Sequence, residues 1–388
     1  MKYRIILLFY FLSLSYFQNC PPSDTTIVSS LQSNWDIPYI NNWDGLEVMT
    51  WNIKQFPISS STLNGVQEII SDLMPDIIVF QELNNLTQYQ LLASSLDAYE
   101  FVNTNYVELG VGYNLGAAIR SDCGTIQSTS MMFVNDQDAE RIFADRYPFN
   151  IIIQWACGLS AINFELINIH LKCCGNGIID YNNNYDEELR RLQATTMLSE
   201  YISNYPEKNI IIAGDYNDEL DDPIENNTLM PLISNPKAHF VTSSLTGFTQ
   251  FSYNSFIDHI LINESLFDEN KLGQAQILKL DNYMGSSFYQ NNISDHRPVI
   301  WSIPIPTSNI PEGLVINEIM YNPISISDSY GEWIELTNIG LEPINLNGLI
   351  LKDNNTDFHV FSSTGPLIIN PGDFFNISVS NDLNNNGN

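Results

Sequence analysis

Hydrophobic and polar positions near the start of the chain follow two different periods. Leu46–Ile53 alternates residue by residue, which predicts a strand. Val66–Met74 carries its apolar residues at helical spacing and ends before Pro75, and Asp76–Phe80 is a short apolar run of the kind found in buried strands. The pattern therefore predicts a strand, a helix and a second strand in succession.

The same organisation continues to about Ile303. Ala161–Leu171 and Asn209–Ala213 are the clearest later strands. A helix is expected between them over Asp186–Tyr205, where an acidic first turn suits the helix dipole. Long strands rich in Ile and Phe with intervening helices indicate a layered α/β or α+β domain.

A second domain is expected after a proline-rich stretch. Pro304, Pro306 and Pro311 exclude a continuous helix and predict a linker over 305–312. Beyond it, short strands alternate with Gly, Pro and Asn turns, which predicts a β-sandwich over 313–388. The expected strands are Val315–Met320, Glu332–Asn338, Ile344–Lys352, Phe358–Phe361 and Phe374–Val379. Because the chain stops in a run of Asn and Gly without a closing strand, we expect this domain to be incomplete.

The N-terminus has the organisation of an export signal. Lys2 and Arg4 precede an apolar run, Ile5–Phe17, which is short for a membrane span but typical of a signal-peptide core. Residues 1–20 are therefore predicted to be a signal peptide and residues 21–44 a polar linker. No transmembrane span is expected in the mature chain.

Export determines which modifications of the cysteines are expected. Cys20 sits where the acylated cysteine of a lipoprotein would sit, and ordinary cleavage near Ser13 or Ser15 is the favoured alternative. The protein is thus expected to be secreted or lipid-anchored on the cell surface. Four further cysteines are an even number in an oxidising compartment, so two disulfides in one of three pairings are expected. They are Cys123, Cys157, Cys173 and Cys174.

Composition limits how the chain can bind polyanions. The 388 residues are 44% hydrophobic, enough for a sizeable core and too apolar for disorder. Acidic residues outnumber basic ones 45 to 15, and the formal charge of -30 leaves no basic stripe to hold nucleic acid or phospholipid by counterion release. Work on such substrates must therefore rely on metal ions.

Polar residues stand at or just beyond the ends of the apolar strands, where open sheets of this kind place their sites. They are Asn52, Glu82, His170, Asp215, Asn217, Asp258, Asp295 and His296. Taken singly, each is more often structural. Taken together, carboxylates and amides suit Mg²⁺ or Mn²⁺, and two histidines can supply protons or stabilise phosphorane oxygens. The set predicts a metal-dependent phosphodiesterase.

In this order the motifs resemble those of the endonuclease/exonuclease/phosphatase superfamily, which includes deoxyribonucleases, abasic-site endonucleases and sphingomyelinases. The resemblance covers about residues 45–304. Its motifs are Asn52, Gln81-Glu82, Asn168-x-His170, Gly214-Asp-x-Asn217, Ile257-Asp-x-Ile260 and Ser294-Asp-His296. It implies an α+β fold, a four-layer αββα sandwich (deoxyribonuclease-like) whose two sheets pack face to face, with the site at one mouth.

The resemblance also implies roles for the site residues. Glu82 would be the principal metal ligand, with Asn52 and Asp295 beside it. His296 would be the general base that activates water, oriented by Asp258. The cofactor expected on these ligands is Mg²⁺ or Mn²⁺, with Ca²⁺ as a further candidate.

The remaining roles concern the phosphate. Asp215 and Asn217 would position water and phosphate or hold a second metal, and His170 would bind phosphate or protonate the leaving oxygen. Arg146, in Asp145-Arg-Tyr-Pro-Phe149, resembles the phosphate-contacting Arg of the deoxyribonuclease branch, and a surface arginine before a strand is an equal alternative.

One departure from that branch concerns His170. A Glu that orients the first histidine there has no counterpart in the uncharged stretch Gly112–Ile119. Asn114, Tyr113 or a distant residue takes that role, or His170 acts differently. His259 varies freely in such motifs and is expected to be structural.

The C-terminal segment resembles the lamin-tail domain, which implies an immunoglobulin-like β-sandwich without catalysis. Val315–Pro323, Gly331–Asn338 and Leu346–Asp353 carry the match. The partner of this module is unknown. Asp382–Gly387 fits the start of a calcium loop, but an Asn-Gly turn is the favoured interpretation.

These features predict an exported, monomeric, metal-dependent endonuclease acting on DNA or RNA. No unusually apolar loop suggests lipid docking, which places a sphingomyelinase-type phospholipase second. An adhesion or matrix-binding protein with a vestigial enzyme domain is the third alternative, and the complete set of site residues speaks against it.

Overall fold

The computed structural model describes residues 5–6, 35–40, 45–105, 113–157, 160–305, 311, 313–321, 323–324, 327–347, 349–352, 358–361 and 365–378. Two compact units divide the chain, one made of residues 30–306 and one of residues 1–29 with 307–388. Within the described ranges, no helix has the length and apolar character needed to cross a membrane.

The larger unit contains two six-stranded sheets. The first has the order β12-β13-β2-β3-β5-β4, and the second the order β10-β11-β9-β8-β7-β6. The strands of the first sheet are β2 (Gly45–Phe56), β3 (Ile77–Leu83), β4 (Tyr99–Asn103), β5 (Asn114–Arg120), β12 (Gln274–Ile277) and β13 (Val299–Pro304). Those of the second are β6 (Gly124–Met131), β7 (Phe149–Cys157), β8 (Ser160–His170), β9 (Ile210–Asp215), β10 (Ala238–Phe240) and β11 (Asp258–Asn263).

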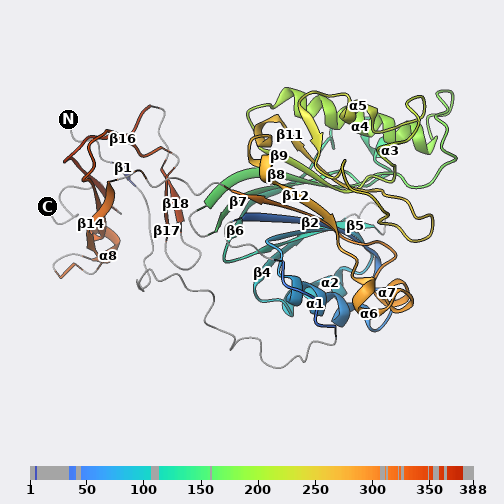
Figure 1. Ribbon diagram of the computed structural model, residues 1–388, viewed down its shortest axis with the longest axis horizontal. Coiled ribbons are helices and arrows are strands. Elements are labelled where there is room, and N and C mark those ends of the chain that lie inside the picture. The colour runs from blue at the N-terminus through green and yellow to red at the C-terminus, as the bar shows by residue number, and fades with distance from the viewer. Residues whose placement is uncertain are drawn as a thin grey trace. The chain divides into compact units, whose positions relative to one another are not determined.

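Helices cover the outer face of each sheet, which gives four layers in the order helix, sheet, sheet, helix (Figure 1). The first sheet is covered by α1 (Thr62–Leu73), α2 (Leu86–Ser94), α6 (Asp281–Met284) and α7 (Ser286–Asn292). The second is covered by α3 (Ala139–Ile142), α4 (Glu187–Asn204) and α5 (Met230–Ile233). Two short 3-10 helices, η2 (Glu264–Leu266) and η3 (Glu269–Leu272), follow β11. The expected α+β four-layer sandwich is confirmed.

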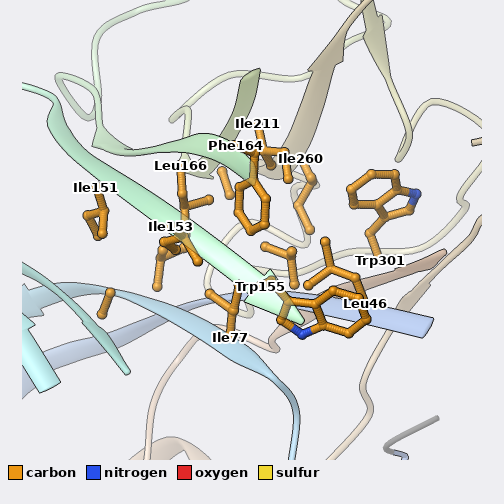
Figure 2. Packing of buried hydrophobic residues seen from close by; sticks show 14 of the residues in the cluster. Leu46, Ile77, Ile151, Ile153, Trp155, Phe164, Leu166, Ile211, Ile260 and Trp301 are labelled. Atoms are coloured by element: carbon orange, nitrogen blue, oxygen red, sulfur yellow. The ribbon is translucent and has the colours of Figure 1, made fainter. Parts of the chain in front are cut away.

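Strand periodicity explains why the two sheets face each other. In β2, Leu46 and Val48 point into the core between the sheets, whereas Met49 and Trp51 point to the helices. The other strands alternate in the same way, because successive side chains of a strand point to opposite faces. Figure 2 shows this shared core, where Leu46 and Ile77 of the first sheet meet residues of the second such as Trp155 and Phe164.

Part of the segment expected to be a linker lies against this unit instead. In residues 35–40, the backbone N–H of Trp35 donates to Glu68 Oε1 at 3.1 Å, and that of Ile37 donates to Asp72 Oδ2 at 3.3 Å. Ile37 is buried, and Trp35 packs on the same cluster. Two apolar side chains therefore anchor this stretch of the expected linker to α1.

The cysteines form one disulfide among the described residues, between Cys123 and Cys157. Antiparallel pairing of β6 with β7 places these two residues side by side at the ends of their strands. The expected second disulfide is not formed, since Cys173 and Cys174 are free thiols. Cys20 lies outside the described residues.

The smaller unit is a β-sandwich of short strands. Its main sheet has the order β1-β20-β15-β14, and two-stranded pairs join β16 to β19 and β17 to β18. The strands are β1 (Ile5–Ile6), β14 (Leu314–Met320), β15 (Trp333–Asn338), β16 (Ile344–Asn345), β17 (Ile350–Lys352), β18 (Phe358–Val360), β19 (Ile368–Ile369) and β20 (Phe374–Ser378), with one short helix, α8 (Asp328–Gly331). Leu336, Leu346, Phe361 and Phe375 belong to its core.

One strand expected in this unit is divided in two. The range Ile344–Lys352 was expected to be continuous, but it forms β16 and β17 with a turn between them. The side chain of Asn345 accepts the N–H of Asn347 at 3.2 Å, which is a turn typical of asparagine and ends the first strand. The segment Asp382–Gly387, for which an Asn-Gly turn was favoured over a calcium loop, lies outside the described residues.

Candidate active site

The candidate site continues the inward-facing stripe of the core to one end of the two sheets. Along β9, Ile211 and Ala213 face the core between the sheets, and Asp215 is the next residue with the same parity. In the same way β8 leads from Leu166 to His170. The inward-facing side chains of these strands are therefore apolar within the sandwich and polar at its mouth.

Register brings these residues together across neighbouring strands. His170 on β8 pairs with Asp215 on β9, and Asp215 pairs in turn with Asp258 on β11. In the first sheet, Asn52 on β2 pairs with Gln81 on β3, which places it next to Glu82. At the same end of the sandwich, the second sheet thus supplies His170, Asp215 and Asp258, and the first sheet supplies Asn52 and Glu82.

Asn52 connects the carboxylates of the two sheets. Its Nδ2 donates to Glu82 Oε1 at 3.2 Å and to Asp215 Oδ2 at 2.9 Å. Its Oδ1 accepts the backbone N–H of Lys54 at 2.9 Å. In this arrangement Asn52 holds two acidic side chains at a fixed separation.

Glu82 is held at the mouth by its backbone as well as by Asn52. Its φ of 64° lies in the left-handed region, which is uncommon for a residue with a side chain. Its Oε2 accepts the backbone N–H of Gln55 at 2.9 Å. Because the carboxylate remains partly exposed, it can reach an incoming cation.

Asp258 and His296 form a buried pair. His296 Nδ1 lies 2.8 Å from Asp258 Oδ2. Burial alone would lower the pKa of His296, but the Asp258 carboxylate overrides it and raises the pKa to about 10. The Asp258 carboxylate thus favours the charged imidazole, and the base role expected for His296 would require a nearby cation that offsets the surrounding carboxylates.

The loop carrying His296 is fixed from behind. Ser294 Oγ donates to the carbonyl of Asn52 at 2.6 Å and accepts the N–H of His296 at 3.0 Å. Arg297 makes two hydrogen bonds of 2.8 Å to Asp281, and its guanidinium stacks on Phe248. His296 and Asp295 are consequently presented by a rigid turn.

Asp215 and Asn217 leave β9 in a tight turn. Asn217 donates its backbone N–H to Asp215 Oδ1 at 2.9 Å, and its side chain donates to the carbonyl of Leu171 at 3.0 Å. Burial, followed by the charge of Asp258, raises the pKa of Asp215 to about 7. A Cβ at Gly214 would lie 2.0 Å from the carbonyl oxygen of Ile169, so only glycine fits before Asp215.

His170 is paired with Arg146, a residue distant in sequence, in the absence of the orienting Glu of the deoxyribonuclease branch. Arg146 Nη1 lies 3.1 Å from both ring nitrogens of His170, and Nη2 donates to the carbonyl of Leu171 at 2.9 Å. Burial, followed by the charge of Arg146, lowers the pKa of His170 well below its usual value. Tyr113 contacts His170 edge to face, whereas the side chain of Asn114 donates to a backbone carbonyl elsewhere.

A buried amide pair joins the two sheets directly behind the site. Gln81 Nε2 donates to Asn168 Oδ1 at 2.8 Å. Asn168 Nδ2 in turn donates to the carbonyls of Phe80 and Gly116, both at 2.9 Å. Both residues belong to the sequence motifs, and the motifs predict no function for either of them.

The loop after His170 is held by α4 and not by a disulfide. Arg191 Nη1 donates to the carbonyls of Lys172 and Cys174, both at 2.9 Å. Glu188 accepts the backbone N–H of Gly177. The loop is therefore tied by charged groups of the helix that follows it.

The donor set fits a hard divalent cation. Ligand atoms of Asp215, Asp258 and His296 lie within 4.8 Å of one another. Asp258 Oδ1 is buried and has no hydrogen-bond partner among the described residues, which is costly for a carboxylate oxygen unless a cation or water satisfies it. Together with Glu82 and Asp295, these oxygens are the ligand type that Mg²⁺ and Mn²⁺ prefer.

His259 is structural, as expected, and its environment gives a pH-dependent stability. It is fully buried, where its Nδ1 pairs with Thr242 Oγ1 and its Nε2 with the carbonyl of Asp218. Burial lowers its pKa to about 4. Because the unfolded chain takes up this proton near pH 6.5, His259 should reduce the free energy of unfolding by about 3 kcal/mol between pH 6.5 and pH 4.

This prediction can be checked by urea unfolding at pH 7 and pH 4. In the His259→Gln variant the loss of stability on acidification should be smaller by that amount, whereas His239→Gln, which changes an exposed histidine on β10, should lose as much as the parent. An unchanged pH dependence in His259→Gln would contradict the assignment.

The fold and the site together define a phosphoesterase of the four-layer type. The sequence matches the Endonuclease/Exonuclease/phosphatase family over residues 49–296 and the Lamin Tail Domain over residues 307–388. The chain belongs to the endonuclease/exonuclease/phosphatase family, and a lamin-tail domain follows its enzyme domain. It is therefore a hydrolase of phosphoester bonds from a family that typically uses a divalent metal.

Solved structures of modest similarity include the following three proteins. D. rerio TDP2, humanized by 14 mutations, is 15% identical, covers 67% of this chain and 99% of its own, and has a TM-score of 0.46. An endonuclease/exonuclease/phosphatase family protein from Bacteroides thetaiotaomicron is 16% identical, covers 67% of this chain and 97% of its own, and has a TM-score of 0.48. The catalytic domain of human Nocturnin is 16% identical, covers 69% of this chain and 95% of its own, and has a TM-score of 0.46. A search among curated proteins finds no match.

Proposed function

We propose that the protein is an exported, metal-dependent endonuclease that hydrolyses phosphodiester bonds of DNA or RNA. The observation that carries this proposal is the pairing of Arg146 with His170 beside the acidic cluster. A buried guanidinium next to a neutral imidazole, 3.7 Å from Asp215, offers a position for one phosphate group against the expected metal ligands. Arginine is well suited to bind phosphate oxygens with two donors.

The chain's own residues account for most of the proposed reaction. Arg146 and Asn217 hold the phosphate, and Asp258 orients the imidazole of His296 toward the attacking water. His170 is neutral and can donate a hydrogen bond to the phosphoryl or leaving oxygen. Asp215, with its pKa of about 7, can also accept a proton near neutral pH.

A divalent ion would be held by Glu82 and Asp295, with Asp215 within reach. When bound, Mg²⁺ or Mn²⁺ supplies charge stabilisation for the phosphoryl oxygens and lowers the pKa of nearby water and imidazole groups. It would also offset the repulsion between an acidic protein of net charge -30 and a polyanionic substrate.

We further propose that the mature chain is secreted or lipid-anchored and acts as a monomer. The support for export is the basic and apolar organisation of residues 1–20, together with the disulfide between Cys123 and Cys157, which is a bond typical of oxidising compartments. The lamin-tail domain would serve as an accessory module.

Digestion of supercoiled plasmid by the purified chain tests the nuclease proposal. Nicking is expected with Mg²⁺ or Mn²⁺ and should stop with EDTA. Arg146→Ala should weaken the reaction mainly through KM, by about tenfold or more, since a charged hydrogen bond to phosphate contributes about 1.5–3 kcal/mol. Arg141→Ala, which changes an arginine on α3 that binds Asn184 and Gln193, is the matched control. An intact plasmid under all metal conditions would contradict the proposal.

A phospholipase of sphingomyelinase type is the second candidate, and one structural observation favours it. The loop between His170 and α4 exposes Ile178, Tyr181 and Tyr185 by 60%, 66% and 69%. The neighbouring Ile224 is 77% exposed, and the two loops are joined by the hydrogen bond from Ile179 to Asn226. Exposed tyrosines can stack on bases, but tyrosine with isoleucine also suits a membrane interface. Release of choline phosphate from sphingomyelin vesicles, with plasmid left intact, would establish this alternative.

A further inference from the structure

Lys54 places a positive charge on one of the expected metal ligands. Its Nζ lies 2.9 Å from Asp295 Oδ2. The Lys54 side chain is 36% exposed and that of Asp295 is 18% exposed, so the ion pair stands at the entrance of the site. An ammonium group and a divalent cation are attracted to the same carboxylate oxygen, and both cannot occupy it.

The backbone that positions Lys54 is unusual. Lys54 and Gln55 have φ values of 35° and 44°, two successive left-handed residues with side chains. Such conformations cost on the order of 1–3 kcal/mol each and persist only where the surroundings determine them. An exposed ion pair contributes only about 0–1 kcal/mol and cannot by itself explain this turn.

The same turn contacts all three expected ligands of the metal. Lys54 N–H donates to Asn52 Oδ1, Gln55 N–H donates to Glu82 Oε2, and Lys54 Nζ reaches Asp295. The two backbone contacts therefore hold the turn in place, and the turn directs the Lys54 side chain to Asp295. The backbone of the site therefore determines where the Lys54 side chain begins, a constraint that a lysine on an unconstrained surface loop would lack.

Lys54 also has room to leave. Its side chain is long and flexible and, at 36% exposure, is not enclosed. Arg146, by contrast, is buried against His170. A phosphate group that enters the site would thus meet one fixed cation and one cation that can exchange Asp295 for the phosphate.

We propose that Lys54 is a built-in competitor of the divalent ion at Asp295, and that a bound phosphate group relieves this competition by attracting the ammonium away from the carboxylate. Metal and phosphate then bind cooperatively, each strengthening the other by the same factor. The enzyme holds its metal weakly until a substrate is present. This inference rests on the proposed metal-dependent phosphoester chemistry.

Calorimetric titration of the metal-free, full-length protein with Mn²⁺, in the presence and absence of inorganic phosphate, tests the proposal. Phosphate should strengthen Mn²⁺ binding by the parent about 5-fold or more. Lys54→Gln should bind Mn²⁺ about 5-fold more tightly than the parent without phosphate, and phosphate should strengthen its binding much less. Lys54→Arg keeps the charge and should behave like the parent.

Lys237→Gln is the matched control. Lys237 is also 36% exposed and forms an ion pair of 3.2 Å, with Glu264, so its loss changes the net charge equally away from these ligands. It should leave both Mn²⁺ titrations unchanged. If Lys54→Gln binds Mn²⁺ as the parent does, or gains as much from phosphate, the competitor role is wrong. If the folded parent and all variants fail to bind Mn²⁺, the proposed metal-dependent function fails with it.

Discussion

Changing Glu82 to Gln is expected to lower the rate of phosphodiester hydrolysis by about 10³-fold or more. The substitution keeps the size of the side chain but removes the carboxylate charge that would bind the metal, and metal stabilisation of the phosphoryl oxygens amounts to several kcal/mol. Oε1 of Glu82 accepts from Asn52 and Oε2 accepts from the backbone N–H of Gln55, so the single amide oxygen left by the substitution can keep one of the two contacts. The measurement is plasmid nicking at several Mn²⁺ concentrations, combined with Mn²⁺ titration.

A matched control separates this effect from a general loss of negative charge. Glu100 lies exposed on β4 of the same sheet, and Glu100→Gln should leave both activity and Mn²⁺ affinity unchanged. Thermal unfolding should show that Glu82→Gln is folded, because the carboxylate is partly exposed and contributes no apolar packing. Normal turnover in Glu82→Gln would remove Glu82 from the site.

The second large effect is expected for His296→Ala, with a loss of about 10²–10⁴-fold in kcat. The imidazole is hydrogen-bonded to Asp258 at 2.8 Å and is the group that we propose moves a proton between water and the site. Asp258→Asn should lose less than His296→Ala, since the imidazole remains but is no longer oriented by a charge. Added imidazole should restore part of the activity of His296→Ala, and a purely structural role would show no such rescue.

The control for His296→Ala is His239→Ala on β10, which should keep full activity. The substrate KM should change little in His296→Ala, because the proposed phosphate ligands Arg146 and Asn217 are unchanged. A loss that appears in KM alone would argue that His296 binds substrate and does not take part in proton transfer.

Strand period predicted much of both the fold and the site. Alternation along Leu46–Ile53 gives the inner and outer faces of β2, and the same parity carries Asp215 and His170 to the mouth of the sandwich. These positions could be found because each lies at the end of a long apolar strand. The four-layer arrangement itself came from the resemblance of the motifs, since period alone does not determine how two sheets pack.

The contacts that could not be predicted are those that depend on irregular backbone or on distant partners. Lys54 received no role, because only a left-handed turn directs its ammonium to Asp295, 241 positions further along the chain. Its signal was limited to its place two residues after Asn52. The pairing of Arg146 with His170 likewise depends on how a loop after α3 packs against β8.

The packing of residues 35–40 and the absence of a second disulfide among the described residues differ from the sequence-based expectations for a common reason. Polar composition suggested a tether, yet Trp35 and Ile37 supply enough apolar contact to fix it. Cysteine parity suggested two bonds, yet the loop of Cys173 and Cys174 is already fixed by Arg191. In both cases a local contact overrides an inference from residue counts.

The amide pair Gln81 and Asn168 has a consequence for how the enzyme would be inactivated. Because it joins the two sheets immediately behind the carboxylates, the halves of the site cannot separate without exposing four buried polar partners at once. Partial opening at the mouth is therefore disfavoured, and heat or denaturant should abolish catalysis only where the sandwich as a whole melts. The enzyme domain should therefore stay active up to the temperature or denaturant concentration at which it unfolds cooperatively, and should then lose structure and function in a single step.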